Sequence, residues 1–116
     1  MAGGEPADPP RGRGLRARVA RRAAAREESR AARARESAAH QAPGGTAEHP
    51  IDIDSPAAIE ARALSKACPT CLGARLLTSH DAETIDGQRL RLVRLHCPRC
   101  GVESTIFFRL AGPAIH

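Results

Sequence analysis

Four cysteines in two short loops are the residues of this chain whose types and spacing could do chemistry. They form two CxxC pairs, with 25 residues between the pairs: Cys68, Cys71, Cys97 and Cys100. A two-residue gap lets one tight turn present both sulfurs to one ion, and four thiolates in a tetrahedron suit Zn²⁺. A four-thiolate site also accepts iron, which is the alternative metal. The spacing therefore predicts a metal site closed by four protein ligands, which is typical of a structural ion.

The same cysteines allow a redox interpretation, because a Cys-Pro-x-Cys sequence can be a disulfide-exchange centre. In thiol oxidoreductases that sequence opens a long helix within a βαβ unit. Here Leu72-Gly73-Ala74 leads toward a predicted strand, and a second matching loop is present. A CxxC thiol oxidoreductase is therefore the alternative function. No Ser-His-Asp order, phosphate-binding glycine loop or paired general acid and base stands out, so we predict that the protein is not an enzyme.

Alternating stretches beside the loops predict the strands that position the cysteines. Residues 74–80 and 88–96 are expected to be extended, and residues 102–110 show the clearest alternation of apolar and polar residues. Asp86-Gly87 between the first two stretches is the strongest turn signal in the chain. A hairpin of this length brings both cysteine loops to one end of a sheet. The metal then supplies folding free energy that the small domain of a chain with 2% aromatic residues needs.

A short helix is predicted just before the first cysteine. Ser55 suits an N-cap and Pro56 suits the first helical position, and the helix should run to about residues 65–67. Asp52 and Asp54 could form an acidic pair for catalysis or for a cation. Carboxylates ahead of a helix start are more often capping groups that complement the helix dipole, and we expect that role here.

The first fifty residues have the composition of a basic tail and linker. Residues 1–50 carry ten arginines against six acidic residues, whereas residues 51–116 carry eight basic against seven acidic residues. Residues 15–39 have high helix propensity but no apolar stripe, so a marginal lone helix is expected within an otherwise disordered tail. The domain that contains the short helix and the metal site is predicted to span residues 51–116.

Charge and the absence of targeting signals lead to predictions of compartment and partner. The sequence has no apolar run long enough for a membrane span and no signal-peptide core, so we expect a cytoplasmic location and no membrane partner. Cytosolic paired cysteines favour metal over disulfides. Residues 11–40 hold ten arginines against three acidic residues, enough to attract nucleic-acid phosphates. A solvated tail is the alternative, because no aromatic residues are interleaved to stack on bases.

A second basic set lies on or near the predicted sheet, where it could face phosphates or simply be solvated: Arg89, Arg91, Arg94, Arg99 and Arg109. His96 adjoins Cys97 and could donate a hydrogen bond to a sulfur. We expect either a nucleic-acid or a protein partner and no small-molecule substrate.

The two Cys-Pro-x-Cys loops, with Gly101 and an alternating strand after the second, resemble those of the zinc-ribbon superfamily over residues 68–110. The resemblance implies two zinc knuckles at one end of a three-stranded antiparallel sheet, with the four cysteines as ligands. The first loop departs from the second, since Leu72 stands where the second loop has Gly101. The whole chain is also similar to small uncharacterised bacterial zinc-ribbon proteins. Zinc ribbons serve transcription, translation and replication or act as scaffolds, so a nucleic-acid-binding module, a protein-binding module and a purely structural docking module are all expected classes.

Overall fold

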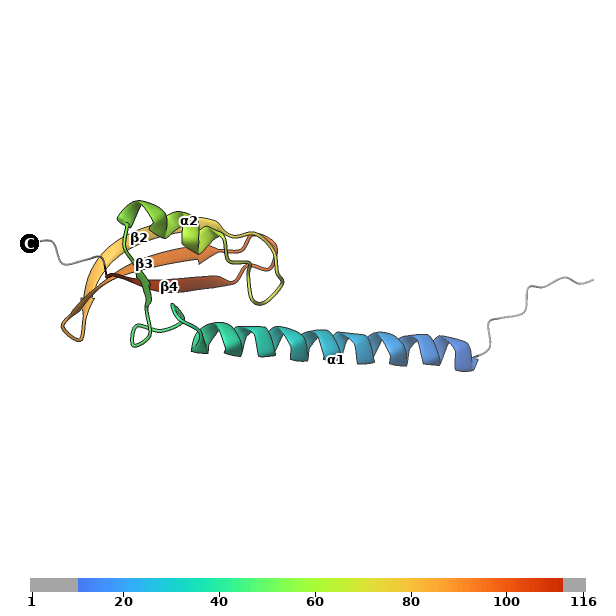
Figure 1. The fold of residues 1–116 in the computed structure, drawn as a ribbon. Coiled ribbons are helices and arrows are strands. Elements are labelled where there is room, and N and C mark those ends of the chain that lie inside the picture. The colour runs from blue at the N-terminus through green and yellow to red at the C-terminus, as the bar shows by residue number, and fades with distance from the viewer. Residues whose placement is uncertain (1–10, 112–116) are drawn as a thin grey trace, which may run out of the picture. The chain divides into compact units, whose positions relative to one another are not determined.

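The computed structural model describes residues 11–111, so the predicted disorder of residues 1–10 lies outside the described residues. Along the chain the elements are α1 (Arg11–Gln41), β1 (Ile51–Ile53), the 3-10 helix η1 (Pro56–Ala58), α2 (Ile59–Leu64), β2 (Leu76–Ile85), β3 (Gln88–His96) and β4 (Glu103–Leu110) (Figure 1). The chain divides into two compact units, Met1–Ala31 and Ala32–His116, and the second unit contains the sheet and the cysteines.

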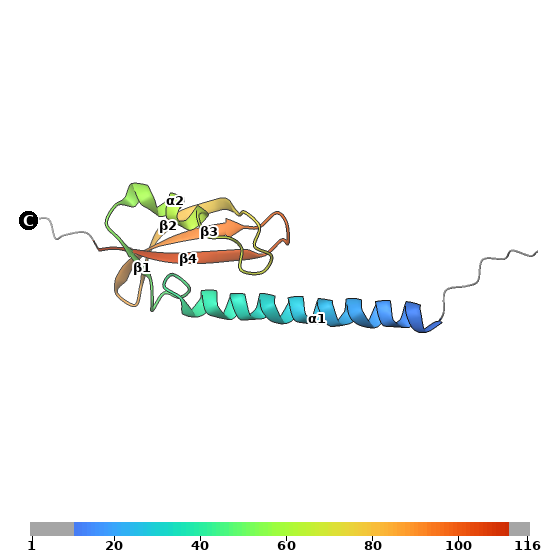
Figure 2. The same ribbon diagram turned by 45° about the vertical axis from the view of Figure 1, so that its right-hand side comes forward.

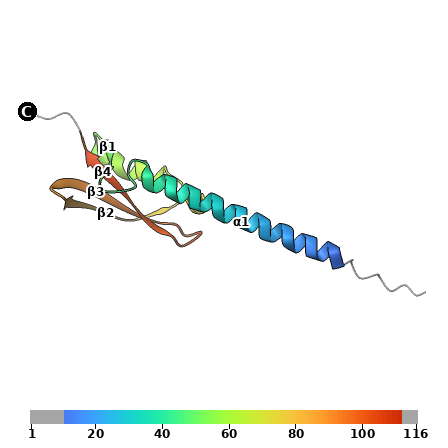
Figure 3. The ribbon, with the colours of Figure 1, turned by 90° about the horizontal axis from the view of Figure 1, so that it is seen from below.

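The four strands form one mixed sheet in the order β1-β4-β3-β2 (Figure 3). β2, β3 and β4 are antiparallel neighbours, whereas β1 pairs with β4 in parallel, with Ile51 opposite Phe108. The predicted three-stranded antiparallel sheet is therefore corrected to four strands with one parallel pair. The sequence did not separate a three-residue strand at Ile51–Ile53 from an extended lead into the following helix, because so short a run has no periodicity of its own.

The β2–β3 hairpin turns at Asp86 and Gly87, as the sequence predicted. Both residues have positive φ, 51° and 77°, the combination that a two-residue type I′ turn requires. Ile85 pairs with Gln88 on either side of the turn, and at the far end Leu76 pairs with His96. The hairpin therefore places the chain just after the first cysteine loop beside the chain just before the second.

α2 lies over one face of the sheet (Figure 2), and the hydrophobic core lies between the two. Ile59 and Ala63 of α2 are fully buried and pack against Val93, Leu95 and Phe108 of the sheet. The expected helix start is present, with Ser55 extended and Pro56 in the first turn, but the Ser55 side chain makes no capping hydrogen bond and α2 ends at Leu64. Seven residues make up the core cluster, so a further source of stability such as a metal ion suits this domain.

β3 has buried residues on both faces, so its sequence does not alternate strictly between apolar and polar residues. Leu92 and Val93 are neighbours that point to opposite faces, and both are buried. The pairing of β2 with β3 has one register shift, in β2 between Leu77 and Ser79.

α1 spans the predicted lone helix 15–39 and extends it at both ends. Its residues 14–31 are all exposed, while residues 32–41 belong to the second unit. Part of the segment predicted as a linker, before residue 51, packs against the sheet. Gly44 is buried there, and its carbonyl oxygen accepts a hydrogen bond of 2.9 Å from the Phe107 N–H. The boundary near residue 50 and the disorder of the isolated tail stay predictions.

Candidate metal centre

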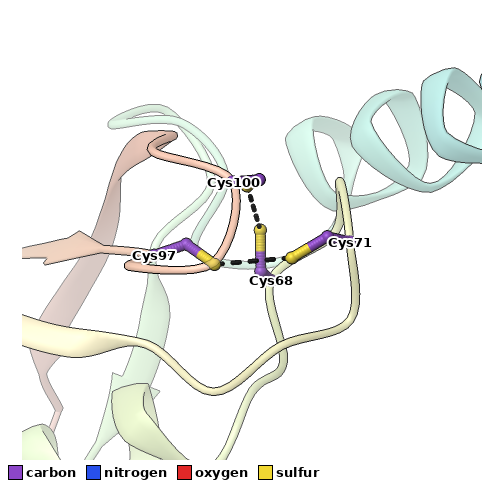
Figure 4. A group of neighbouring side chains, drawn as sticks. All are labelled: Cys68, Cys71, Cys97 and Cys100. Atoms are coloured by element: carbon purple, nitrogen blue, oxygen red, sulfur yellow. Dashed lines mark hydrogen bonds between the residues drawn. The ribbon is translucent and has the colours of Figure 1, made fainter.

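The four cysteine sulfurs meet at one end of the sheet (Figure 4). All four Sγ atoms lie within 4.8 Å of one another. Two sulfur–sulfur contacts run between the loops, at 3.4 Å from Cys71 to Cys97 and 3.6 Å from Cys68 to Cys100. A tetrahedron of sulfurs around Zn²⁺ has edges of about 3.8 Å, since each Zn–S bond measures about 2.3 Å. The structure thus brings together the four residues that the sequence singled out, in a cluster of the size that holds a metal ion.

The two cysteine loops have the same backbone hydrogen bonds. Each residue of the second knuckle (residues 97–102) follows its counterpart in the first knuckle (residues 68–73) by 29 positions, as 97 follows 68. In each knuckle the first cysteine accepts at its carbonyl oxygen from the fifth residue and donates its N–H to the carbonyl oxygen of the sixth. These bonds are Leu72 N–H to Cys68 (2.7 Å), Cys68 N–H to Gly73 (2.9 Å), Gly101 N–H to Cys97 (2.7 Å) and Cys97 N–H to Val102 (3.0 Å).

This turn requires a left-handed residue at its fifth position. Gly101 has φ of 81° and Leu72 has φ of 66°. Glycine takes this conformation without steric cost, whereas a residue with a Cβ pays about 1–2 kcal/mol. In the first loop it is Leu72, and not the glycine that follows it, that adopts the left-handed conformation. Gly73 permits close packing: its N–H donates to Cys71 Sγ at 3.4 Å, and a Cβ there would lie 3.2 Å from that sulfur.

The pKa values of Cys97 and Cys100 are shifted in opposite directions. The N–H groups of Cys100 and Arg99 point at the Cys97 sulfur and, against burial, lower its pKa to about 6. The Val102 N–H favours the Cys100 thiolate, but desolvation of the thiol and the three neighbouring sulfurs raise the pKa of Cys100 to about 12. Four thiolates this close repel one another, so all four can ionise together when a cation lies among them.

One arginine is buried beside the cluster. Arg75 is 7% exposed, and it donates from Nη1 to Ser104 Oγ at 3.0 Å and from Nη2 to the Lys66 carbonyl oxygen at 2.9 Å. Burial lowers the pKa of Arg75, and the charges of Cys68 and Cys97 act in the opposite direction. Arg75 was not predicted from the sequence. Its position four residues after Cys71, matching Ser104 four residues after Cys100, was the available signal.

The C-terminal part of α1 contacts the first knuckle. Arg35 donates from Nε to the Pro69 carbonyl oxygen at 2.8 Å and from Nη2 to the Thr70 carbonyl oxygen at 2.9 Å. The Thr70 hydroxyl donates to Glu36 Oε1 at 2.9 Å. No sequence signal points to these contacts, because more than thirty residues separate the partners.

Other residues considered in the sequence take part in surface pairs. Asp52 forms a bidentate ion pair with Arg109, at 2.7 and 3.0 Å, and the hydrogen bond from Arg109 lowers the pKa of Asp52. Asp52 therefore forms an ion pair across β1 and β4 and does not cap the helix that follows. Arg94 pairs with Asp81 at 2.8 Å and with Glu83 at 3.3 Å, so two of the five sheet arginines have carboxylate partners.

Within residues 11–111, His96 makes no hydrogen bond to a cysteine sulfur. The His80 side chain forms a hydrogen bond of 2.8 Å with the Glu60 carboxylate, away from the cysteines. No helix in the same range combines the length and hydropathy needed to cross a lipid bilayer.

No protein-family model matches the chain, and no curated protein or solved structure is significantly similar to it. The cysteine geometry is therefore the main guide to function.

Proposed function

We propose that this protein is a non-enzymatic zinc-binding module whose single Zn²⁺ is structural and is held by Cys68, Cys71, Cys97 and Cys100. The observation that carries the proposal is the four-sulfur cluster, with all Sγ atoms within 4.8 Å of one another and matching hydrogen bonds in both knuckles. Four protein ligands leave no open coordination position, so the ion would close the fold and perform no reaction. Zinc is preferred to iron because it is redox-inert, so a structural site of four thiolates is not altered by oxidation of the ion.

The sulfur contacts favour metal binding over disulfide exchange. A thiol oxidoreductase would join the two cysteines of one CxxC loop, whereas the sulfur contacts of 3.4 and 3.6 Å here join different loops. Cys68 and Cys97 are buried, and a catalytic thiol needs access to its substrate disulfide.

Cobalt substitution tests the proposed coordination. We expect metal-free protein to take up one Co²⁺ per chain with the visible spectrum of a tetrahedral tetrathiolate complex, and one equivalent of Zn²⁺ to displace it. Uptake of less than one equivalent, or a spectrum without the thiolate charge-transfer bands, would refute the four-cysteine site. Iron in protein purified without added metal, identified by its own absorption, would refute the choice of zinc.

We further propose that the partner of this module is nucleic acid, bound through α1. Arg18, Arg22, Arg26 and Arg30 follow one another at steps of four, which places them along one side of a helix, and all four are exposed. Like charges in such a row destabilise a helix slightly. A row of phosphates would offset that repulsion and release counterions.

Binding to duplex DNA and to RNA across a salt series tests this partner. We expect the affinity of the zinc-loaded chain to fall steeply with salt, with a slope of log affinity against log salt that drops by about 0.9 for each lost DNA phosphate contact. Changing Arg18, Arg22, Arg26 and Arg30 to glutamine should flatten the slope, while changing Arg89 and Arg91 of β3 should leave it nearly unchanged. No binding at low salt would refute the nucleic-acid partner and favour a protein partner.

A further inference from the structure

Arg75 is the one buried polar or charged residue among residues 14–111, with 7% of its surface exposed. Its two hydrogen-bond partners, Ser104 Oγ and the Lys66 carbonyl oxygen, are both neutral. Its Nε atom is inaccessible to solvent and has no hydrogen-bond partner. A guanidinium withdrawn from water is costly unless a negative charge lies nearby.

The negative charge that acts on Arg75 comes from the cysteine cluster. Cys68 and Cys97, one from each knuckle, are the groups whose charges favour the ionised guanidinium. Four thiolates around one Zn²⁺ leave two uncompensated negative charges. A buried cation beside the cluster balances one of these two negative charges, and the cluster in turn balances the charge of the buried cation.

We propose that Arg75 is the counter-cation of the metal-loaded cysteine cluster and that its charge raises the affinity of the site for zinc. This inference rests on the proposed zinc site. It goes beyond that site by assigning the zinc affinity in part to a residue that is not a ligand.

The hydrogen bonds of Arg75 tie its guanidinium to residues that lie close in the chain to each knuckle. Arg75 follows Cys71 by four residues, and its partner Ser104 follows Cys100 by four residues. Its other partner, the Lys66 carbonyl oxygen, lies two residues before Cys68. These bonds fix the charge relative to both loops before any metal is bound, so binding of the ion requires little reorganisation of the charge.

A ligand in the neighbouring cavity does not account for Arg75. A cavity of about 550 Å³ borders Arg75 and Lys66 between the end of α1 and β4. The unpartnered Nε atom is buried from solvent, so a ligand in this cavity could not reach it without rearrangement. The cysteine cluster is therefore the better partner for the buried charge.

Zinc affinity measured by competition with a chromophoric chelator tests the proposal on the full chain. Arg75→Met removes the charge, Arg75→Lys keeps it, and Ser104→Ala removes one hydrogen bond while the charge stays. We expect Arg75→Met to weaken zinc binding by about 10- to 100-fold, the range typical of residues that support metal ligands. Arg75→Lys and Ser104→Ala should each stay within about 3-fold of the parent chain.

Arg99→Met is the matched control, because Arg99 lies between Cys97 and Cys100 in the sequence but is exposed. Solvent screens an exposed charge, so we expect no more than about a 3-fold change. The tetrahedral Co²⁺ spectrum should be retained in all four variants, since none removes a ligand.

Zinc binding by Arg75→Met within 3-fold of the parent chain would overturn the inference. Equal losses in Arg75→Met and Arg75→Lys would also overturn it, since hydrogen bonding and packing would then account for the effect. If Arg75→Met fails to fold, the other two variants test the proposal. Zinc binding by Arg75→Lys and Ser104→Ala within 3-fold of the parent chain would support the role of the charge. A larger loss in either variant would point to packing or hydrogen bonding and overturn the inference. Failure of the parent chain to bind zinc would instead refute the proposed function itself.

Discussion

The two knuckles of this molecule reach the same backbone geometry with different residues. Both close with the same pair of hydrogen bonds, and both place a left-handed residue after the second cysteine. The second knuckle uses Gly101, whereas the first uses Leu72. The second leaves Cys100 exposed, whereas Cys71 of the first is partly covered.

The first knuckle also has support that comes from a distant part of the chain. Arg35 holds the carbonyl oxygens of Pro69 and Thr70, two residues that lie between its cysteines. A strained backbone conformation persists where the surrounding structure fixes it. The comparison indicates that contacts outside the first knuckle offset the strain at Leu72, while the second knuckle needs no such support because Gly101 is unstrained.

The largest effect should come from the loss of one ligand. Cys97→Ser leaves three thiolates for the ion, and structural zinc binding contributes about 10–16 kcal/mol to folding in small domains. We expect residues 68–110 to lose their sheet, as measured by circular dichroism and by amide dispersion in NMR spectra. His96→Ala, at the adjacent residue, should keep both sheet and zinc. A Cys97→Ser chain that retains its sheet and a full equivalent of zinc would refute the closed site.

The support of the first knuckle should be visible in Arg35→Ala. Two charge-assisted hydrogen bonds are lost from a partly buried site, so the zinc-loaded domain should lose about 2 kcal/mol of unfolding free energy in urea. By linkage, the zinc affinity should fall as well, because metal binding and this contact stabilise the same loop.

Arg33→Ala is the matched control, since Arg33 lies two residues earlier in α1 and is exposed. Its unfolding free energy should stay within about 0.5 kcal/mol of the parent value. Equal effects of the two substitutions would show that helix charge, and not the contact with the first knuckle, determines the change.

The second knuckle should be sensitive to the loss of its glycine. In Gly101→Ala the new Cβ meets nothing within 4 Å, so the cost comes from the positive φ alone. The strain should destabilise the folded state by about 1–2 kcal/mol. Alanine also restricts the unfolded chain, which offsets about 0.4–1 kcal/mol of this cost. We therefore expect the unfolding free energy to fall by about 1 kcal/mol. Urea unfolding of the zinc-loaded protein measures it. An unchanged midpoint would mean that the turn relaxes to another conformation.

The first knuckle should respond in the opposite direction. Leu72→Gly relieves the same strain and adds the same unfolded-state entropy, but it also removes the packing of a side chain that is 58% exposed. We expect a gain in unfolding free energy below about 1 kcal/mol, the smallest effect of the series. A clear loss of stability would indicate that the Leu72 side chain stabilises the knuckle more than its backbone strains it.

The sequence predicted those parts of the molecule that depend on local patterns. The CxxC spacing, the Asp86-Gly87 turn and the alternation in residues 102–110 led to the cysteine cluster and to three of the four strands. The parallel pairing of β1 with β4 was missed, because a three-residue strand takes its structure from its partner and not from its own residues.

The contacts around the cysteine cluster could not be predicted from the local sequence. Arg35 and the first knuckle are far apart in the chain, and the burial of Arg75 follows from the packing of three segments. The left-handed conformation of Leu72 was likewise hidden, since leucine rarely adopts it and the neighbouring Gly73 offered an apparent alternative.

Native mass spectrometry of the protein purified without added metal tests the central claim most directly. The account predicts one Zn²⁺ per chain and no disulfide. After removal of the metal under reducing conditions, four free thiols should react with an alkylating reagent. A metal-free chain that carries a disulfide between Cys68 and Cys71, or between Cys97 and Cys100, would contradict it.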